Sequence, residues 1–159
     1  MKKNLLIRMD KIGDLVLTLP VDQVLDPVDE TIWFTAKGLE FLTENSLPKR
    51  SYEGFSKVFS WSEFRRMTEK IKMIQPDRAI IFQAPWWVGL AVWWAQVPIR
   101  VAVKSQWHSF LFFNRSVRQK RSQAQKHEAH YSLELLETAT NKKFDFKNLK
   151  SLSLSIQLK

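Results

Sequence analysis

Two aspartates and a lysine lie within a short polar segment close to the start of the chain. The preceding run, Asn4–Arg8, is mostly apolar and typical of a buried strand, and a second apolar run begins after Asp14. Asp10, Lys11 and Gly13 lie between the two runs, where we expect a tight turn that leads into a helix. A carboxylate in such a turn can accept a proton from a hydroxyl group, and a lysine can bind an anion. This turn is therefore the first candidate for chemistry.

The turn lacks the fingerprint of a dinucleotide-binding loop, because G-x-G-x-x-G needs three glycines and only Gly13 is present. Two roles stay open for Asp14 from its position alone: it can cap the predicted helix, or it can act as a general base. A helix N-terminus stabilises the carboxylate anion and so weakens it as a base. Desolvation by bound substrates would have to offset that effect.

The elements that would hold this turn in place follow along the whole chain. Besides the strand at 4–8, we expect strands at 31–35, 57–60, 79–82 and 99–103, and helices at 14–25, 38–44, 62–75, after Pro85, and at 127–139. Pro20 predicts a kink in the first helix, or a helix proper that begins near Thr18. Residues 45–54 are expected to form a loop, and residues 149–158 a final edge strand or the start of a further segment.

Strands that alternate with helices predict one α/β domain over residues 1–159, with a Rossmann-like, doubly wound and mostly parallel sheet. In such a sheet, ligands bind beyond the carboxyl ends of the strands. Asp10, Lys11 and Asp14 follow the first strand, so we expect them at that edge.

The segment Gln83–Pro98 contains four tryptophans, at positions 86, 87, 93 and 94. Their spacing of seven predicts that they share one broad face of a helix. Three interpretations are open: a helix packed in the core, which we favour, a helix that touches the membrane interface, and a membrane-spanning helix. Two prolines and two glutamines within residues 83–98 argue against the spanning helix.

The net charge of +9 is concentrated in one part of the chain. Residues 78–127 contain eight lysines and arginines and no acidic residue, whereas residues 1–77 contain twelve residues of each sign. A segment this long without a carboxylate predicts a surface that faces anions, namely nucleic acid, anionic lipid or a phosphorylated sugar. Cysteine is absent, which excludes disulfides, thiolate metal sites and cysteine nucleophiles.

The stretch His127-Glu128-Ala129-His130 resembles part of a zinc-binding helix but has the wrong spacing. The pattern H-E-x-x-H separates its histidines by four positions, whereas these two are separated by three. We therefore expect no metal site here. We expect instead that His127 and Glu128 cap or orient the start of the last helix.

Two stretches of the chain form longer patterns. Residues 8–20 read R-x-D-x-I-G-D-x-V-L-T-x-P, and residues 100–128 contain R-x-x-x-x-S-x-W-x-S-x-L-F-x-N followed by R-S-x-x-x-K-H-E. Both stretches resemble glycosyltransferase family 9, the heptosyltransferases of lipopolysaccharide synthesis. The matching residues of the second stretch are Arg100, Ser105, Trp107, Ser109, Arg121, Ser122, Lys126, His127, Glu128 and, three residues further on, Tyr131.

The resemblance implies a fold and a set of roles. It implies the N-terminal half of a GT-B enzyme that binds an acidic, lipid-linked saccharide acceptor, with Asp14 as the catalytic base. Guanidinium and ammonium groups suit phosphate and carboxylate ligands. The residues assigned to acceptor binding are Asp10, Lys11, Gly13, Arg100, Arg115, Arg118, Arg121 and Lys126, and His127 and Glu128 would support the site.

The family's other half carries the donor. The resemblance implies an inverting reaction without metal or cofactor, in which a nucleotide-sugar such as ADP-heptose binds mainly to a C-terminal domain. We expect 159 residues to be too few to supply that domain. The chain would then be a fragment, or a half that pairs with a separate chain or with a second copy of itself, and would transfer no sugar alone. We expect it in the cytoplasm, peripheral on the inner membrane.

A second function class is a non-catalytic basic module that binds anionic lipid or nucleic acid. Basic loops with aromatic residues bind single strands by stacking and phosphate contacts. The tryptophans, however, lie in an apolar segment and are not interleaved with lysine or arginine. No known nucleic-acid-binding motif is present either, so we do not expect nucleic acid as the partner.

Overall fold

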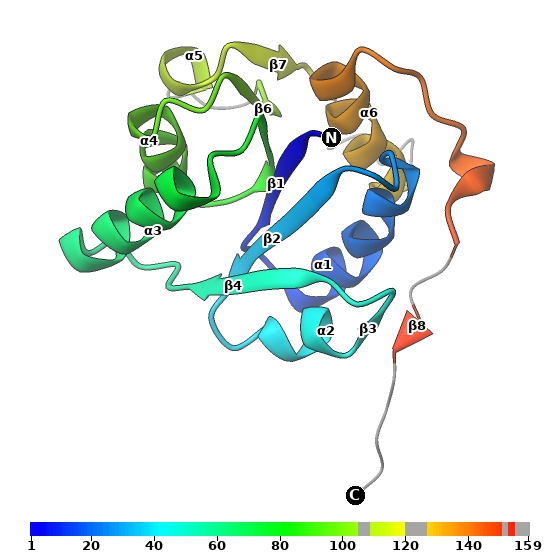
Figure 1. Ribbon diagram of the computed structural model, residues 1–159, viewed down its shortest axis with the longest axis horizontal. Coiled ribbons are helices and arrows are strands. Elements are labelled where there is room, and N and C mark those ends of the chain that lie inside the picture. Colours follow the sequence, from blue (N-terminus) through cyan, green and yellow to red (C-terminus); the bar gives the residue numbers. More distant parts are fainter. Residues whose placement is uncertain (105–108, 120–126, 151–152, 155–159) are drawn as a thin grey trace, which may run out of the picture.

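The computed structural model describes residues 1–104, 109–119, 127–150 and 153–154. A six-stranded sheet crosses the molecule in the order β4-β2-β1-β5-β6-β7, and every neighbouring pair is parallel (Figure 1). The strands are β1 (Lys3–Arg8), β2 (Glu30–Ala36), β4 (Ser51–Phe55), β5 (Arg78–Gln83), β6 (Ile99–Val103) and β7 (Arg115–Val117). From β1 the sheet grows in one direction through β2 and β4, and in the other through β5. The strand order therefore reverses between β1 and β5, where doubly wound proteins bind ligands.

Helices cover both faces of this sheet. They are α1 (Ile12–Thr18), α2 (Glu40–Glu44), α3 (Trp61–Ile74), α4 (Trp86–Trp94), α5 (Ser109–Phe112) and α6 (Glu128–Thr140), with 3-10 turns η1 (Leu19–Val24) and η3 (Phe146–Asn148). α3 and α4 pack on one face, and α1, η1 and α6 on the other (Figure 1). The predicted Rossmann-like fold is confirmed.

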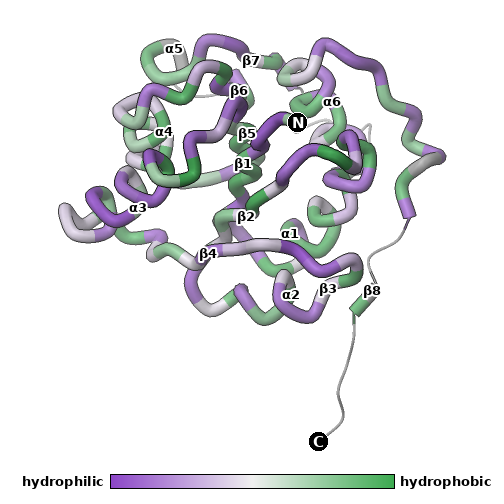
Figure 2. Tube along the Cα trace, viewed as in Figure 1, coloured by the Kyte–Doolittle hydropathy of each residue, from purple (hydrophilic) through white to green (hydrophobic). Residues whose placement is uncertain are grey.

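Strand β1 lies at the centre of both cores. Leu5 and Ile7 point toward α3 and α4, whereas Leu6 points toward α1 and α6, and all three side chains are fully buried. Successive side chains of a strand point to opposite faces, so an unbroken apolar run is what a strand covered on both sides requires. Figure 2 shows this hydrophobic character along β1 and β5.

Two strands of the main sheet lie where the sequence predicted no strand. The third strand of the sheet in chain order is β4, within the expected loop 45–54, and not the segment 57–60. Phe55 ends β4 and packs against Phe34 of β2, with ring centres 4.7 Å apart. β7 lies in the acid-free segment 78–127, after the last strand predicted there, and its three residues pair with β6. Both strands are polar enough that pairing with a neighbour, not propensity, decides their state.

Helix boundaries also differ in detail from the prediction. The first helix begins at Ile12, two residues before Asp14, and continues past Thr18 as η1, which has Pro20 in its first turn. The cap of α3 is Ser60, whose hydroxyl accepts a hydrogen bond from the Glu63 amide, and not the predicted Ser62. The sequence predicted a final strand or a further segment over residues 149–158. Within that range the structure has β8 (Ser153–Leu154), which pairs with β3 (Ser46–Leu47) and not with the main sheet.

The tryptophan-rich helix is a core helix, as we favoured, but its four tryptophans differ in how far they are buried. Trp87 is 1% exposed, whereas Trp86, Trp93 and Trp94 are 46%, 44% and 56% exposed. Among the described residues, no helix has the length and apolar character needed to cross a membrane.

A buried ion pair fixes η1 to the loop before β4 and yields a stability prediction. The Asp22 carboxylate accepts hydrogen bonds from the Arg50 guanidinium and from the Trp33 indole, and the two charged side chains are only 9% and 3% exposed. Asp22→Ala leaves the guanidinium buried and unpaired, so urea denaturation should show a loss of about 3 kcal/mol in the free energy of unfolding. The exposed Asp26→Ala should change it by less than about 0.5 kcal/mol. Equal effects would contradict this account.

Candidate functional site

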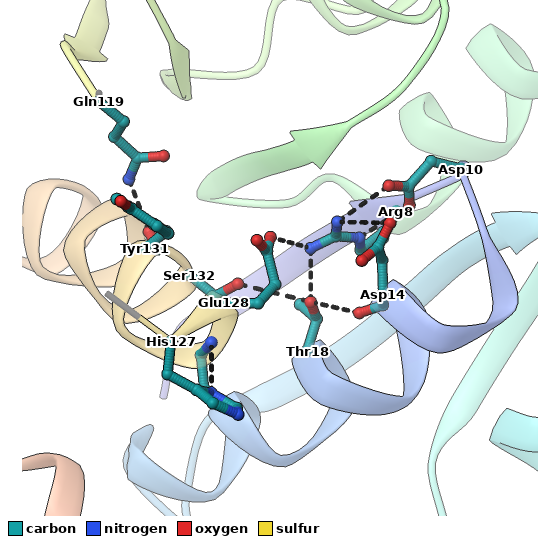
Figure 3. Close-up of polar contacts among 10 residues, drawn as sticks. Arg8, Asp10, Asp14, Thr18, Gln119, His127, Glu128, Tyr131 and Ser132 are labelled. Atoms are coloured by element: carbon teal, nitrogen blue, oxygen red, sulfur yellow. Dashed lines mark hydrogen bonds and ion pairs between the residues drawn. The ribbon is translucent and has the colours of Figure 1, made fainter. Parts of the chain in front are cut away.

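A buried arginine organises the carboxyl end of β1. The Arg8 side chain is 2% exposed, and its guanidinium donates to both carboxylate oxygens of Asp10, at 2.8 and 2.9 Å. It also donates to the Thr18 hydroxyl at 2.6 Å and to the Glu128 carboxylate at 2.8 Å (Figure 3). A desolvated charge persists only where such partners replace water. Arg8 thereby joins β1, α1 and α6 at one point.

Asp14 lies beside this arginine but remains open to solvent. Its carboxylate is 3.7 Å from the Arg8 guanidinium, and its side chain is 38% exposed. Lys11 occupies the N-cap position of α1 and makes no side-chain cap bond, so Asp14 lies in the first turn and does not cap the helix. Of the two roles left open by the sequence, the cap is therefore excluded.

The two aspartates differ in acidity because their surroundings differ. Burial raises the pKa of Asp14 above the ordinary value, the hydrogen bond and charge of Asp10 raise it further, and the attraction of Arg8 does not cancel them. Burial also disfavours ionised Asp10, but the hydrogen bonds and charge of Arg8 outweigh it, so the pKa of Asp10 lies below the ordinary value. Asp10 thus stays ionised, while Asp14 is the stronger base of the pair.

Open space lies next to Asp14. Lys11 and Gly13 are exposed, and a Cβ atom added to Gly13 would meet nothing within 4 Å. Nothing in the described fold therefore requires glycine at this position. A glycine here lets a ligand approach the backbone beside the Asp14 carboxylate.

The start of α6 completes the site from the other side. Glu128 supplies the carboxylate that Arg8 reaches, and the His127 ring nitrogen accepts a hydrogen bond from the Ala129 amide at 3.3 Å. His127 therefore caps α6, as the sequence predicted, whereas Glu128 is the first residue of the helix and pairs with Arg8. The described residues include no group of three or more His, Cys, Asp or Glu side chains arranged to hold a metal ion. The space between the Asp10 and Glu128 carboxylates is filled by the Arg8 guanidinium.

The structure does not bring the predicted basic residues to this cluster. Arg100 lies near the amino end of β6, where its guanidinium donates to the Phe112 and Val97 carbonyls. Arg115 begins β7 and donates to the Thr138 carbonyl at the C-terminal end of α6. Both lie at the opposite edge of the sheet from Asp14, because their strands are parallel to β1. The expectation that these two arginines line the acceptor site is corrected.

Arg118 is exposed and follows β7, three strands from β1, in a groove whose other lining residues include Glu134, Glu137 and Asn141. It does not face Asp14 either. The predicted residues Arg121 and Lys126 lie outside the described residues.

Two residues at the site were missed by the sequence analysis. Arg8 was part of the family pattern but received no role, although a charge at the end of a buried strand signals a necessary ion pair. Lys57 follows β4, and its ammonium group donates to the backbone carbonyl of Asp10. No sequence signal marks Lys57, because only the parallel arrangement of the strands places the ends of β4 and β1 along the same edge.

Comparison with known proteins is consistent with this geometry. No family model matches the chain. A protein of Haemophilus influenzae named “Putative glycosyltransferase” is 28% identical over 145 residues, which are 89% of this chain and 42% of that protein. The glycosyl transferase family 9 structure from Veillonella parvula superposes with a TM-score of 0.80 at 17% identity. The match covers 99% of this chain and 45% of the Veillonella chain.

This chain has the family 9 glycosyltransferase fold. The resemblance predicted from the sequence is thereby confirmed at the level of the fold. E. coli heptosyltransferase WaaC with ADP-2-deoxy-2-fluoro heptose matches with a TM-score of 0.67 at 18% identity, over 87% of this chain and 48% of its own. E. coli ADP-heptose lps heptosyltransferase II also matches with a TM-score of 0.67. It is 12% identical, and the match covers 99% of this chain and 47% of the heptosyltransferase chain. The chain spans less than half the length of the relatives that it matches.

The unequal acidity of the two aspartates can be measured directly. In a carboxyl-carbon NMR titration, Asp14 should titrate above an ordinary aspartate and Asp10 below it. Glu128→Gln should lower the pKa of Asp14, because the Glu128 charge helps to raise it. Glu134→Gln, on the same helix, is the matched control and should leave it unchanged. An Asp10 that titrates above Asp14 would contradict the assignment.

The same shifts predict opposite effects of pH on stability. The pKa of Asp10 is lowered in the folded state, so its contribution is present above the ordinary aspartate value and is lost as pH falls through the lowered one. The pKa of Asp14 is raised, so its contribution is present below the ordinary value and is lost as pH rises through the raised one. Denaturation of Asp14→Asn across the acid range should remove the second effect and weaken the first, because the Asp14 side chain also helps to lower the pKa of Asp10.

Proposed function

We propose that this chain is the acceptor-binding domain of an inverting glycosyltransferase. The enzyme would transfer a heptose or a related sugar from a nucleotide-sugar, such as ADP-heptose, to a lipopolysaccharide core acceptor. The observation that carries the proposal is Asp14, an accessible carboxylate with a raised pKa at the carboxyl edge of the sheet. The names of the similar heptosyltransferase structures support the choice of substrates.

In the proposed reaction, Asp14 accepts the proton of an acceptor hydroxyl as its oxygen attacks the anomeric carbon of the donor sugar. The bond from that carbon to the nucleotide diphosphate breaks at the same time, so the configuration inverts and the diphosphate leaves with the electron pair. General-base catalysis of this kind typically contributes about 100- to 10,000-fold. The raised pKa makes the proton transfer more favourable than an ordinary aspartate would.

The charges around Asp14 would assist this step in two ways. The hydrogen bonds of Arg8 go to Asp10, Thr18 and Glu128, so the guanidinium lowers the basicity of Asp14 only through the longer 3.7 Å contact. Lys11 is exposed at the start of α1 and can bind a phosphate or carboxylate of an acidic acceptor. The basic residues of 78–127 are not needed for this part of the proposal.

We propose further that residues 1–159 form one domain and that a second domain supplies the donor site. The chain corresponds to less than half of each related protein. A separate C-terminal domain or a partner chain would bind the nucleotide-sugar across the same edge of the sheet. Metal and cofactor are not required by the proposed mechanism, because the base and the leaving diphosphate account for the proton and the electron pair.

A second surface suits contact with a membrane. Trp93 and Trp94 lie with Lys72 and Pro98 around a groove at the C-terminal end of α4. Indole rings favour the membrane interface, and lysine favours anionic headgroups. This surface would let the protein lie on the cytoplasmic face of the inner membrane.

The space beside Asp14 gives a test of acceptor binding. Gly13→Ala should weaken the binding of lipopolysaccharide core oligosaccharide about tenfold in calorimetric titration, because the added methyl group enters the proposed site. The same change should leave stability unchanged or raise it by up to about 1 kcal/mol, because alanine is favoured over glycine in a helix.

Lys142→Ala is the matched control, since it removes an exposed charge at the far end of α6. It should not change the affinity. Equal loss in both variants, or salt-dependent binding of heparin with the same affinity, would favour the non-catalytic basic module.

The two-domain proposal predicts that the chain alone produces no glycoside. Residues 1–159 incubated with ADP-heptose and lipopolysaccharide core acceptor should give no product by mass spectrometry, because the donor site lies in a domain that the 159 residues do not supply. A product that disappears in Asp14→Asn would show that this single domain is sufficient and would overturn the assignment of the donor to a second domain.

A further inference from the structure

Two exposed tryptophans and a half-buried phenylalanine form a group that is called here the aromatic platform: Trp61, Trp86 and Phe59. The Phe59 ring is the centre, 5.3 Å from the Trp61 ring in an edge-to-face arrangement and 5.6 Å from the stacked Trp86 ring. It is also 6.4 Å from the buried Trp87 ring, which anchors the platform to the core. Trp61 and Trp86 are 75% and 46% exposed. Such large apolar surfaces are costly to leave in water unless a ligand uses them.

The platform lies at the same edge of the sheet as Asp14 but over the opposite face, because α3 and α4 cover one face and α1 covers the other. Trp86 opens α4 directly after β5, whereas Asp14 lies in α1 directly after β1. The two strand ends are joined by a hydrogen bond from the Met9 amide to the Gln83 carbonyl, at 2.8 Å. α1 and α4 pack on opposite faces of the sheet (Figure 1). The Asp14 carboxylate and the platform therefore flank the joined ends of β1 and β5 from opposite faces, at the edge where such sheets bind ligands.

Lys57 makes hydrogen bonds both to the Asp10 segment and to the aromatic residues at the start of α4. Its ammonium group donates to the Asp10 carbonyl, and its own carbonyl accepts a hydrogen bond from the Trp87 indole at 3.3 Å. Phe59 is two residues further along the same loop. Gln83 is exposed and is the last residue of β5, so it lies at the same edge. Aromatic rings, an exposed glutamine and an ammonium group are thus present at the edge of the sheet that carries Asp14.

We propose that the aromatic platform is a saccharide subsite, which binds a sugar unit of the acceptor next to the unit whose hydroxyl faces Asp14. The C–H bonds on one face of a pyranose carry partial positive charge and suit the negative face of an indole ring. The Gln83 amide can exchange hydrogen bonds with the hydroxyl groups at the rim. This inference rests on the proposed function, because it assumes that the acceptor is a saccharide with more than one unit.

A lipid surface is the competing occupant, and the ion pairs beside the platform disfavour it. Anionic membranes attract clustered lysines and arginines, whereas the Arg66 guanidinium is already paired with the Glu53 and Glu63 carboxylates. The Trp93 and Trp94 surface lies at the opposite end of α4, beside Lys72. The two exposed tryptophan groups of α4 are therefore assigned to different ligands.

The test uses residues 1–159 labelled with nitrogen-15 and follows the indole N–H signals of the seven tryptophans. Trp61→Phe, Trp86→Phe and Trp94→Phe variants assign the three signals needed. Core oligosaccharide released from lipopolysaccharide is the first probe, and vesicles of equal parts phosphatidylglycerol and phosphatidylcholine are the second. The oligosaccharide should shift the Trp61 and Trp86 signals and leave the Trp94 signal unchanged.

Alanine variants measure the strength of the contact. Trp61→Ala and Trp86→Ala should each weaken oligosaccharide binding about five- to tenfold, the range expected from the loss of one aromatic contact. Trp94→Ala, which removes an equally exposed ring at the other end of the helix, should bind as the unchanged protein does. Because all three rings are exposed, each variant should keep its melting temperature within a few degrees, and a variant that does not is replaced by its Phe counterpart.

The remaining outcomes overturn the inference and separate it from the proposed function. Oligosaccharide that shifts the Asp14 carboxyl signal but neither Trp61 nor Trp86 would exclude the subsite and keep the acceptor site. Vesicles that shift Trp61 and Trp86 in place of the oligosaccharide would assign the platform to a membrane. Oligosaccharide that shifts none of these signals would exclude both the subsite and the proposed function.

Discussion

The need to pair one buried charge shapes this molecule at its functional edge. Arg8 ends the central strand with a guanidinium that water does not reach, and a charge in that position is stable only if carboxylates and hydroxyls surround it. Asp10, Thr18 and Glu128 meet that need from three separate elements. Because one of them lies at the start of α6, the ion pair also fixes a helix more than a hundred residues away in the sequence.

The same ion pair determines the chemistry that is left for Asp14. The Arg8 hydrogen bonds go to its other partners, so its charge holds Asp10 ionised while Asp14, at 3.7 Å, keeps a raised pKa. A carboxylate with full access to the guanidinium would be a much weaker base. An acceptor hydroxyl would meet this base at the reversal point of the strand order, with the aromatic platform at the same edge over the opposite face of the sheet. The sheet therefore brings together two kinds of contact that are far apart along the chain.

Net charge proved a poor guide to the position of the site. The acid-free segment 78–127 suggested one cationic surface, yet Arg100 and Arg115 donate to backbone carbonyls at the opposite edge of the sheet. An arginine that satisfies the end of a strand or helix serves the fold, and its charge is not available to a distant ligand. The short turn with its two aspartates is a better guide to the carboxyl edge of the sheet than the sum of charges is.

The sequence by itself determined the fold class, the central strands and the turn with its two aspartates, because these depend on local apolar periodicity and on a short family pattern. It could not place β4 or β7, whose polar residues become strands only when a neighbour pairs with them. Only the tertiary structure decided that Arg8 and Lys57 meet at Asp10, that Asp14 does not cap its helix, and which tryptophans stay exposed. Each of those outcomes depends on contacts between distant segments, and such contacts produce no periodic pattern in the sequence.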